Sequence, residues 1–464
     1  METLISNKIY IKYPSQRILD FCYDELIVNN PDYVTMIRLG KENIAQIKHI
    51  PAKLNLFTIN GNQVILPFGC LRRIWGLISP YPYQVDFNEN EPISCRFDQI
   101  SQPLFDYQEK ATEAMLNAKG GVLVGGCGSG KTNIGCELVK RIGKRFLWLT
   151  HTLDLARQTR DRFKKLYPNM KIGLTSDGKV DFGHDGTIAT VQTMVKLDRE
   201  IYENQFDLVI VDECHKCVGS PTLAKMFSKV VGTIPARYKY GLTATPKRND
   251  SLTQTIYTTL GANVEGEFAP VYTIDRSKTK TLTAEHRRID TNVPFSYSML
   301  NDDGTFNFGG LVDYLSTSQE RNELIVDNVV KLQKEGRKQI ILCSRIEHCE
   351  TLVEMINEKG IKAVLLVGKV TEKKRQKILS GETEWDVIVG TISLAKEGLD
   401  IPELDTLHLV SIINNRSDTV QCVGRIERVY EGKKDPIVFD YVDKNIPYTI
   451  SRYKNRAGWL KNRD

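Results

Sequence analysis

Short apolar runs alternate with amphipathic stretches over most of the chain. One series lies before residue 246 and a second after residue 337: GVLVGG, RFLWLT, GTIAT, FDLVIVD and KYGLTAT, then KQIILCS, KAVLLVG, WDVIVGT, TLHLVS and PIVFDYV. Helical spacing of apolar positions follows these runs. Near-continuous apolar strands that alternate with helices predict parallel sheets buried on both faces.

The pattern divides the chain into four parts. Residues 1–98 alternate with period two in KIYIKY and QVILPF and contain turn signals such as INGNQ, which predicts a small α+β domain. Residues 99–275 form a first α/β domain and residues 321–464 a second one with a basic tail. We interpret residues 276–320, which break the rhythm, as a connector containing a strand excursion and a loop. The expected fold class is therefore α/β, with two parallel-sheet domains.

The composition indicates a globular protein but does not identify its function. A chain of 464 residues with 41% hydrophobic and 26% charged residues indicates a globular protein with two or three domains. A net charge of +6 suits a nucleic-acid partner but equally an ordinary, slightly basic enzyme. The N-terminus lacks signal-peptide features, and no apolar run reaches the roughly 20 residues of a membrane helix. The 10 scattered cysteines indicate reduced thiols, so we expect a cytoplasmic protein, in the host cytoplasm if it is viral.

The segment VLVGGCGSGKTNIG contains a phosphate-binding loop. It fits the pattern G-x-x-x-x-G-K-[ST] between an apolar strand and a helix. Small residues let backbone N–H groups turn toward phosphates, and the helix N-terminus adds partial positive charge. Lys131 would reach the β- and γ-phosphates of ATP, and the Thr132 hydroxyl would bind Mg²⁺. The expected nucleotide-binding residues of the loop are Gly126, Gly128, Ser129, Gly130, Lys131 and Thr132.

The segment LVIVDECHKC admits two kinds of site. Asp212 and Glu213 end an apolar strand, where a P-loop ATPase holds Mg²⁺ with an acid. Asp212 would bind the metal, and Glu213 would orient and deprotonate the attacking water. The alternative is zinc, with Cys214, His215 and Cys217 as ligands. Structural zinc takes four ligands, usually from two separated pairs, and the other cysteines provide no second C-x-x-C, so the pattern favours magnesium, with Cys214 as a small buried residue.

Together with these two segments, the region of about residues 100–445 resembles the superfamily 2 helicases, with its motifs in the same order. FDYQ resembles the glutamine motif, which implies that Gln108 recognises adenine through its amide. LTHTLDLARQ and IATVQT resemble motifs Ia and Ib. The resemblance implies contacts with a nucleic-acid strand by Thr152, Thr190 and Gln192.

Two further motifs of this region concern coupling between the ATP site and the strand. VDECH resembles motif II in its DExH form, which implies a role for His215 between the ATP site and the second domain. GLTATP resembles motif III, where Thr243 and Thr245 would couple the state of ATP to the grip on the strand.

The second α/β domain continues the resemblance. LCSRIEHCETL resembles motif IV, with Ser344 and Arg345 near the strand. VGTISLAKEGLDIP resembles motif V. It implies that Thr391 faces the strand, and that Gly398 and Asp400 face the nucleotide.

QCVGRIERV fits the Q-x-x-G-R-x-x-R pattern of motif VI, in which Gln421, Arg425 and Arg428 would face ATP. Arg428 is the first choice as arginine finger. Two positions depart from the family pattern. Phe105 stands where many relatives carry arginine, and Glu427 stands where an apolar residue is common; this acid would either temper the field of the finger or point to solvent.

The resemblance implies two RecA-like domains that close on Mg²⁺–ATP and step along DNA, with 3′→5′ movement. LPFGCLRRI resembles a segment of the UvsW-type branch-migration helicases of phages, which suggests forked, single-stranded or Holliday-junction DNA as partner, in replication, recombination or repair. The alternatives are a duplex translocase that does not unwind, a viral RNA or transcription helicase, and a non-catalytic ATP-binding clamp.

Two basic segments could touch DNA or could be structural. In the first segment, Arg72, Arg73 and Trp75 would contact duplex DNA. Alternatively, this segment would form a helix that packs Trp75 inward and leaves the arginines in solvent. The tail would bind single strands by stacking and charge, or would form a helix that caps the second domain. Its aromatic and basic residues are Arg452, Tyr453, Lys454, Arg456, Trp459, Lys461 and Arg463.

Overall fold

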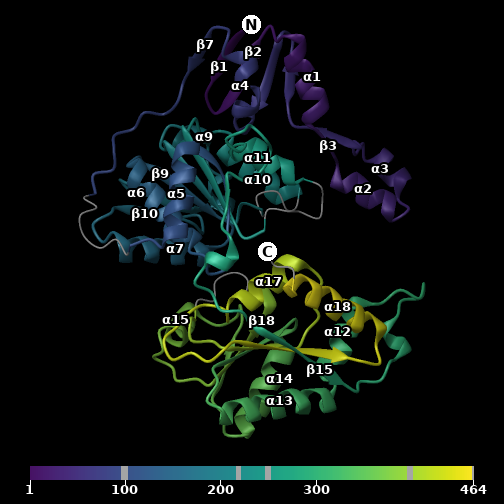
Figure 1. Cartoon of the computed structure of the whole chain (residues 1–464). Coiled ribbons are helices and arrows are strands. Elements are labelled where there is room, and N and C mark those ends of the chain that lie inside the picture. The colour runs from purple at the N-terminus through teal and green to yellow at the C-terminus, as the bar shows by residue number, and fades with distance from the viewer. Residues whose placement is uncertain (96–102, 216–220, 246–251, 394–400, 462–464) are drawn as a thin grey trace. The chain divides into compact units, whose positions relative to one another are not determined.

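The computed structural model describes residues 1–95, 103–215, 221–245, 252–393 and 401–461 (Figure 1). The chain forms two compact units, Met1–Lys278 and Thr279–Asp464. No helix in these described ranges has both the length and the apolar character that a membrane span requires.

The first unit begins with a mixed five-stranded sheet in the order β5-β6-β2-β1-β7. Its elements are β1 (Glu2–Ile5), β2 (Lys8–Lys12), β5 (Thr58–Asn60), β6 (Gln63–Pro67) and β7 (Tyr83–Val85), with α1 (Gln16–Glu25) and α4 (Leu71–Ile78). The predicted period-two runs are β2 and β6, whose alternate residues Ile9, Ile11, Val64 and Leu66 are buried between the sheet and the helices. A small lobe of β3 (Ile27–Asn29), β4 (Lys53–Asn55), α2 (Pro31–Arg38) and α3 (Glu42–Ile47) stands apart from this sheet (Figure 1).

The larger sheet of the first unit is fully parallel, in the order β10-β11-β9-β12-β13-β8-β14. Its strands are β8 (Gly120–Val124), β9 (Phe146–Thr150), β10 (Ile172–Thr175), β11 (Gly186–Thr190), β12 (Leu208–Asp212), β13 (Tyr238–Thr243) and β14 (Tyr272–Thr273). One face packs on α5 (Asp106–Ala118), α6 (Lys131–Ile142) and α7 (Leu153–Leu166). The other packs on α8 (Val191–Met194), α9 (Arg199–Tyr202), α10 (Pro221–Val231) and α11 (Thr253–Leu260). Burial on both faces explains why these strands are apolar throughout.

The N-terminal sheet is packed closely on the parallel-sheet domain. A Cβ on Gly69, in the turn after β6, would lie 2.1 Å from the Tyr257 carbonyl oxygen of α11. The buried Lys239 of β13 donates from Nζ to the Val231 carbonyl (3.1 Å) and to the Asn7 carbonyl of the N-terminal sheet (3.4 Å). These contacts make the N-terminal domain part of one unit with the first parallel sheet.

The second unit contains a six-stranded parallel sheet in the order β15-β20-β19-β16-β18-β17. Its strands are β15 (Glu285–Thr291), β16 (Gln339–Cys343), β17 (Ala363–Leu366), β18 (Val387–Thr391), β19 (Thr406–Leu409) and β20 (Ile437–Asp443). The described helices of eight or more residues are α12 (Phe308–Thr317), α13 (Gln319–Lys334), α14 (Ile346–Glu358), α15 (Glu372–Leu379), α17 (Arg416–Gly424) and α18 (Pro447–Lys461). Separate apolar clusters lie on the two faces, one with α13 and α14 and the other with α15 and α17. The predicted α/β class with two parallel-sheet domains is confirmed.

The segment 276–320 is more than a link between domains. Its strand β15 pairs with β20 along the full length of the strand, and α12 packs its Leu311 and Leu315 into the second unit. The second unit therefore begins well before residue 321. The sequence pattern did not reveal this because β15 is an edge strand with the sequence EHRRIDT, in which only Thr291 is buried.

Candidate functional site

The phosphate-binding loop connects the carboxyl end of β8 to the N-terminus of α6. Gly128 and Gly130 adopt the left-handed region (φ +78° and +79°), which favours glycine. A Cβ on Gly130 would lie 2.1 Å from Nε2 of Gln108, so glycine is also required by packing. The loop thus has the strand–loop–helix arrangement that the sequence motif predicts.

The polar side chains of this loop bond to its own backbone. Lys131 Nζ donates to the carbonyls of Gly125 (2.8 Å) and Gly126 (3.2 Å), and Ser129 Oγ donates to Gly126 (2.8 Å). Thr132 follows in the first turn of α6 and is half-buried. The Lys131 ammonium is therefore held above the loop, at the helix N-terminus where phosphate groups bind in proteins.

The carboxylate pair lies on the same edge of the sheet, because β12 and β8 are parallel strands of one sheet. The Asp212 side chain at the end of β12 accepts from the Glu213 N–H at 2.9 Å, and Glu213 adopts a left-handed backbone (φ +47°). Burial and the neighbouring Glu213 carboxylate raise the pKa of Asp212 to about 7, while the Lys131 ammonium lowers it. Two crowded carboxylates beside an ammonium form a donor set that suits a hard divalent cation.

His215 joins the carboxylate pair to the end of β13. Its Nδ1 lies 2.8 Å from Thr243 Oγ1 and 3.3 Å from a carboxylate oxygen of Glu213. The Thr243 hydroxyl donates to the Thr245 carbonyl (3.2 Å) and accepts from the Thr245 N–H (3.1 Å). Since the hydroxyl has one proton, the Thr243 bond to the Thr245 carbonyl goes together with the tautomer in which His215 Nδ1 donates to Thr243. The structure therefore brings together the three residues predicted for coupling in this unit.

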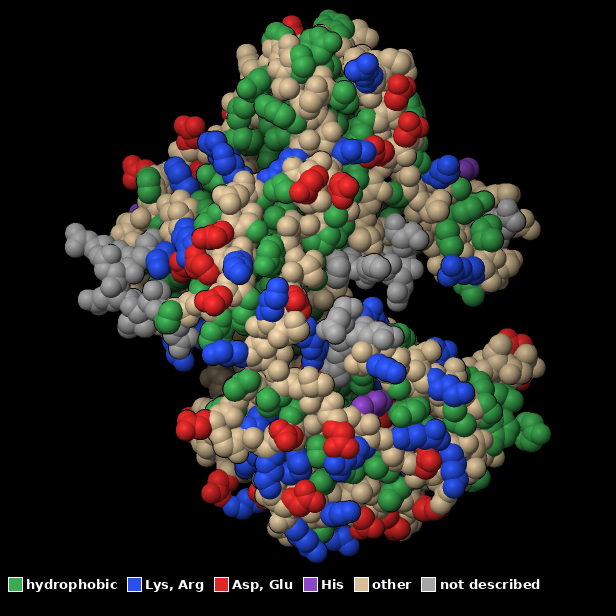
Figure 2. Space-filling view, viewed as in Figure 1, with side chains coloured by type: hydrophobic (Ala, Val, Ile, Leu, Met, Phe, Trp, Pro, Cys, Tyr) green, Lys and Arg blue, Asp and Glu red, His purple; other side chains and the backbone are tan. Residues whose placement is uncertain are grey.

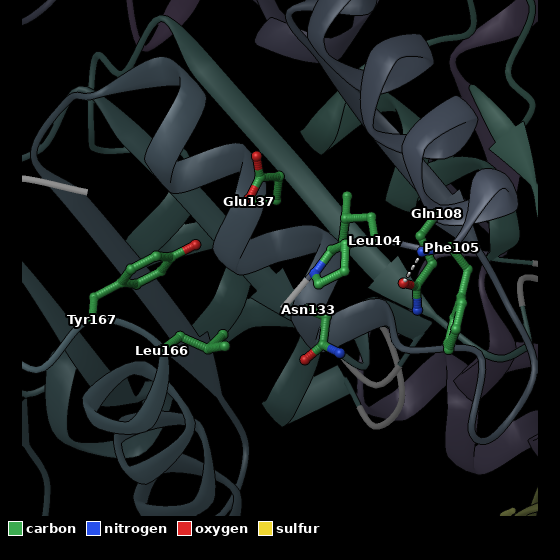
Figure 3. A pocket seen from close by; sticks show the side chains of 8 residues that line it. Leu104, Phe105, Gln108, Asn133, Glu137, Leu166 and Tyr167 are labelled. Atoms are coloured by element: carbon green, nitrogen blue, oxygen red, sulfur yellow. Dashed lines mark hydrogen bonds between the residues drawn. The ribbon is translucent and has the colours of Figure 1, made fainter. Parts of the chain in front are cut away.

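A pocket of about 330 Å³ lies beside the phosphate loop (Figure 3). It is lined by Pro103, Leu104, Phe105, Gln108, Asn133, Glu137, Leu166 and Tyr167. The Phe105 ring stacks on Tyr107 (centroids 5.8 Å, interplanar 20°) and is 42% exposed, so it presents an aromatic face to the pocket. The volume and mixed lining are those of a small-molecule site.

Gln108 lies deep in this pocket and is 4% exposed. Its Oε1 accepts from the Phe105 N–H (3.1 Å), the bond drawn in Figure 3, and its Nε2 donates to the Ser129 carbonyl (3.1 Å). Both ends of the amide are thus used within the chain. In this structure Gln108 fastens α5 to the phosphate loop, a role that the sequence motif did not indicate.

The lining of the pocket includes residues that the sequence analysis did not select. Asn133 and Glu137 are four residues apart on α6, so they share a helix face with the end of the phosphate loop. That spacing was a usable signal. Tyr167, at the C-terminus of α7, reaches the pocket only through tertiary packing, and no sequence signal pointed to it.

The predicted strand-contact residues of the first unit lie at the carboxyl ends of the neighbouring strands β9 and β11. Thr152 caps α7 by accepting from the Leu155 N–H (3.4 Å), and Thr190 donates to Thr193 Oγ1 (3.0 Å). Gln192 Nε2 donates to the His151 carbonyl (2.8 Å) and so ties the two loops together. The structure shows these residues organising the loops; contact with a strand remains a prediction.

In the second unit, Ser344 follows β16, and Thr391 is the last residue of the paired strand β18, in register with Cys343. Ser344 and Arg345 are exposed, and Arg345 Nε donates to Asp313 of α12 at 2.7 Å. These residues form one polar edge at the carboxyl ends of β16 and β18. Gly398 and Asp400 lie outside the described residues.

The motif VI residues follow one another along α17 and the segment after it. Gln421 is buried, with no hydrogen-bond partner for its Oε1 among the described residues, and Arg425 and Arg428 are half-buried. The Lys433 ammonium donates to the Arg428 carbonyl at 2.8 Å, which supports the backbone of that arginine.

Glu427 does not point to solvent. It is 2% exposed, its carboxylate accepts from the Ala284 N–H (3.0 Å), and its carbonyl accepts from the Leu282 N–H (2.8 Å). The acid that departs from the family pattern thus anchors the segment before β15 to motif VI.

The structure shows the intramolecular contacts of the two basic segments. On α4, Arg72 donates to the Ala262 carbonyl (3.3 Å) and Arg73 pairs with Glu25, whereas Trp75 is 42% exposed. The expectation that Trp75 packs inward is wrong, and Arg72 is half-buried, whereas Arg73 is exposed as expected; contact with duplex remains a prediction. Arginine reaches protein carbonyl and carboxylate groups here, and Trp75 packs only its edge on Tyr83.

The basic tail forms α18, which packs on α17 and β20. Arg456 is 3% exposed and holds the buried Asp440 with two bonds of 2.6 and 2.9 Å, while His286 Nε2 lies 3.0 Å from the same carboxylate. Tyr453 packs against His286 with the ring centroids 5.5 Å apart. These contacts are those of a helix that caps the second unit; Arg463 lies outside the described residues.

Cys214 belongs to the apolar core on the face of α10 and α11 and is fully buried. A Cβ on Gly241 would lie 2.8 Å from its Sγ, so the thiol fills space against β13. Cys217, the second thiol of the zinc alternative, lies outside the described residues. The described part of the chain holds no cluster of three or more His, Cys, Asp or Glu side chains arranged for a metal.

Two family models match the chain. The model described as "Type III restriction enzyme, res subunit" matches residues 101–248, and the model described as "Helicase conserved C-terminal domain" matches residues 320–430. The first covers the phosphate loop and the carboxylate pair, and the second covers motifs IV to VI.

Several relatives align over most of the chain. "Probable helicase D10" of Escherichia phage T5 is 26% identical over 96% of this chain and 91% of that protein. "DNA 3'-5' translocase XPB2" of Sulfurisphaera tokodaii is 26% identical over 80% of this chain and 89% of that protein. A protein of Acanthamoeba polyphaga mimivirus, provisionally named ATP-dependent RNA helicase L396, is 27% identical; the match spans 76% of this chain and 66% of that protein.

One solved structure shares the fold, and a second aligns over the whole chain. Dbp5 from S. cerevisiae, bound to RNA and ADP BeF3, matches 85% of this chain and 92% of that chain, with a TM-score of 0.55 and 14% identity. T4 UvsW matches 100% of this chain and 98% of that chain at 17% identity, with a TM-score of 0.42.

Proposed function

The chain belongs to the superfamily 2 helicases, an ATP-dependent family, and on that premise we propose that it couples ATP hydrolysis to movement along DNA. The observation that carries the proposal is the edge where Lys131, Asp212 and Glu213 meet. The buried Asp212 carboxylate, with the half-buried Glu213 carboxylate and the Lys131 ammonium beside it, fits a site for Mg²⁺ and a nucleoside triphosphate.

We propose the following roles for the residues of this site. Mg²⁺–ATP, when bound, supplies a phosphoryl group that can be transferred to water. Thr132 and Asp212 would hold the metal, and Lys131 would exchange its loop carbonyls for phosphate oxygens. Glu213 would orient the attacking water and accept its proton.

The pocket beside the loop would bind the adenine base. The exposed Phe105 face offers stacking, and the Asn133 side chain, which lines the pocket, offers an amide group. Because both ends of the Gln108 amide are bonded within the chain, we propose that base binding and loop position depend on each other through this residue.

Coupling to nucleic acid would run through His215. The bond from His215 to Thr243 connects the carboxylate pair to the loop after β13. A change in hydrogen bonding at Glu213 during hydrolysis would thus reach Thr243 and Thr245. Arg425 and Arg428 are proposed to contact the transferred phosphoryl group, with Arg428 as the arginine finger.

We further propose that the substrate is DNA with forks or junctions, that phosphate contacts by the motif Ia, Ib, IV and V residues hold one strand, and that movement is 3′→5′. The S. tokodaii relative, named as a DNA 3'-5' translocase, supports DNA as the substrate and this direction of movement. An RNA substrate is the second candidate, favoured by the name of the mimiviral relative.

The test is nucleic-acid-stimulated ATP hydrolysis. Phosphate release is measured with single-stranded DNA, linear duplex, forked DNA, a four-way junction and RNA of equal length, at one stated salt concentration. The proposal predicts the largest stimulation with forked or four-way DNA and no hydrolysis by Lys131→Ala. If only RNA stimulates ATP hydrolysis, RNA and not DNA is the substrate. If no nucleic acid stimulates hydrolysis, the assignment as a helicase is refuted. Duplex stimulation without strand separation would indicate a translocase.

A further inference from the structure

An exposed group of aromatic rings lies on the second unit, outside the motifs described above. We call it the aromatic edge and define it as Phe295, Tyr297, Phe306, Phe308 and Tyr448. Tyr297 is 83% exposed, Phe308 41% and Phe295 39%. Figure 2 shows hydrophobic side chains gathered on the outer side of this unit, next to where Figure 1 draws α12. Exposed rings in contact with one another are unusual on a surface that binds nothing.

The rings form a continuous series rather than isolated side chains. Phe295 is in edge contact with Tyr297 (5.6 Å between centroids) and with Phe306 (6.4 Å). Phe306 lies 5.1 Å from Tyr448, and Phe308 lies 6.4 Å from the same ring. A small apolar core that includes the fully buried Met299 and Ile446 fixes the backbone beneath them. Phe306 and Tyr448 are therefore held in place by packing, and Phe295 and Tyr297 extend the series to the surface.

The aromatic edge continues the polar edge at the carboxyl ends of the strands. Its two segments follow β15 and β20, which are parallel to β16, the strand that ends at Ser344 and Arg345. Arg345 donates to Asp313 of α12, and its guanidinium lies 3.8 Å from the position of a Cβ on Gly309, next to Phe308. At the other end, the Arg452 guanidinium lies 4.6 Å from the centroid of Tyr448. Cations thus flank the rings on both sides.

We propose that the aromatic edge binds the bases of an unpaired nucleic-acid strand, with Tyr297 stacking on a base as the strand leaves the polar edge. Aromatic faces flanked by arginine are the chemistry that recognises unpaired bases. The acidic turn beside the rings, with Asp302 and Asp303, disfavours phosphates, so contact is made through bases. The inference rests on the proposed function, because it extends the strand contact of Ser344 and Arg345.

The test compares wild-type and variant proteins in their affinity for an unstructured single strand that carries 2-aminopurine. The fluorescence emission of this base falls when it stacks on an aromatic ring. Tyr297→Ala should weaken binding by about tenfold, within the range known for one base–aromatic stack, and should restore emission of the bound probe. Tyr297→Phe should retain both. The matched control is Tyr23→Ala, which removes a ring that is 55% exposed on α1 and should leave binding unchanged.

The salt dependence separates stacking from charge. Tyr297→Ala should leave the slope of log affinity against log salt unchanged, whereas Arg345→Ala should reduce it by about one. Thermal unfolding should not change for Tyr297→Ala, because the ring is exposed.

Wild-type protein that binds no nucleic acid would overturn the proposed function and this inference together. Normal binding by wild type and equal affinity and emission for Tyr297→Ala would overturn the inference alone and would leave the aromatic edge as a protein-docking surface.

Discussion

Replacing Lys239 by methionine should change how the stability of the first unit depends on pH. Lys239 is fully buried between β13 and the N-terminal sheet, and burial lowers the pKa of its ammonium to about 7. Its Nζ donates to the carbonyls of Val231 and Asn7 and lies 4.7 Å from the centroid of Phe68. No carboxylate is among these partners, so desolvation of the charge dominates.

The magnitude follows from proton linkage. Between about pH 7 and pH 10 the unfolded chain holds a proton on this lysine and the folded chain does not. Stability therefore rises with pH in this window, by up to about 1.4 kcal/mol per pH unit. Methionine removes this slope. It also leaves the two carbonyls without their donor, at a cost of ~1–3 kcal/mol that does not depend on pH.

The assay is urea unfolding of the whole chain, followed by circular dichroism at pH 7, 8 and 9, for wild type and Lys239→Met. Other groups titrate equally in both proteins, so the difference isolates Lys239. Lys8→Met is the matched control, since Lys8 in β2 lines a pocket together with Lys239 but is exposed. Parallel stability curves for wild type and Lys239→Met would refute the reasoning, because they would show that the buried amine keeps its proton.

Three further variants test the site and the tail. Glu213→Gln should slow DNA-stimulated ATP hydrolysis by about 10²–10⁴-fold and retain ATP binding, measured by phosphate release and nucleotide titration; unchanged turnover would exclude Glu213 as the base. Thr243→Val removes the acceptor for His215 and should lower stimulation by DNA more than basal hydrolysis, in the same assay; equal loss of both rates would argue against coupling. Arg456→Met removes the arginine from the buried Asp440 carboxylate and leaves His286 as its remaining side-chain partner. This should destabilise the second unit by about 3–5 kcal/mol in urea without changing the salt dependence of DNA binding; a weakened salt dependence with full stability would restore the tail as a DNA contact.

Several features of this protein could be predicted from the sequence because local rules set them. Each near-continuous apolar run forms a strand of a parallel sheet. A strand covered by helices on both faces is buried at every position, so its sequence is apolar throughout and can be recognised. The phosphate loop was equally predictable, because its glycines, lysine and threonine act within one turn between a strand and a helix. The placement of Asp212 and Glu213 followed from the parallel sheet, which gathers strand ends at one edge.

Other features depended on packing between distant segments. The polar strand β15 became part of the second sheet only because it pairs with β20. Glu427 was an anomaly in the sequence, and the Ala284 N–H that donates to its carboxylate lies far away in the chain. In the sequence Arg456 is one of several basic residues of the tail; only the structure shows that it forms a buried ion pair with Asp440.

The difference has one physical reason. A hydrophobic period and a tight phosphate loop are specified by residues within a few positions of each other, so the sequence determines them alone. The partner of a charged or amide side chain is chosen by which buried groups the fold brings within hydrogen-bonding distance. Gln108 shows both: its motif marked the nucleotide site, and only tertiary structure decided that its amide joins α5 to the phosphate loop.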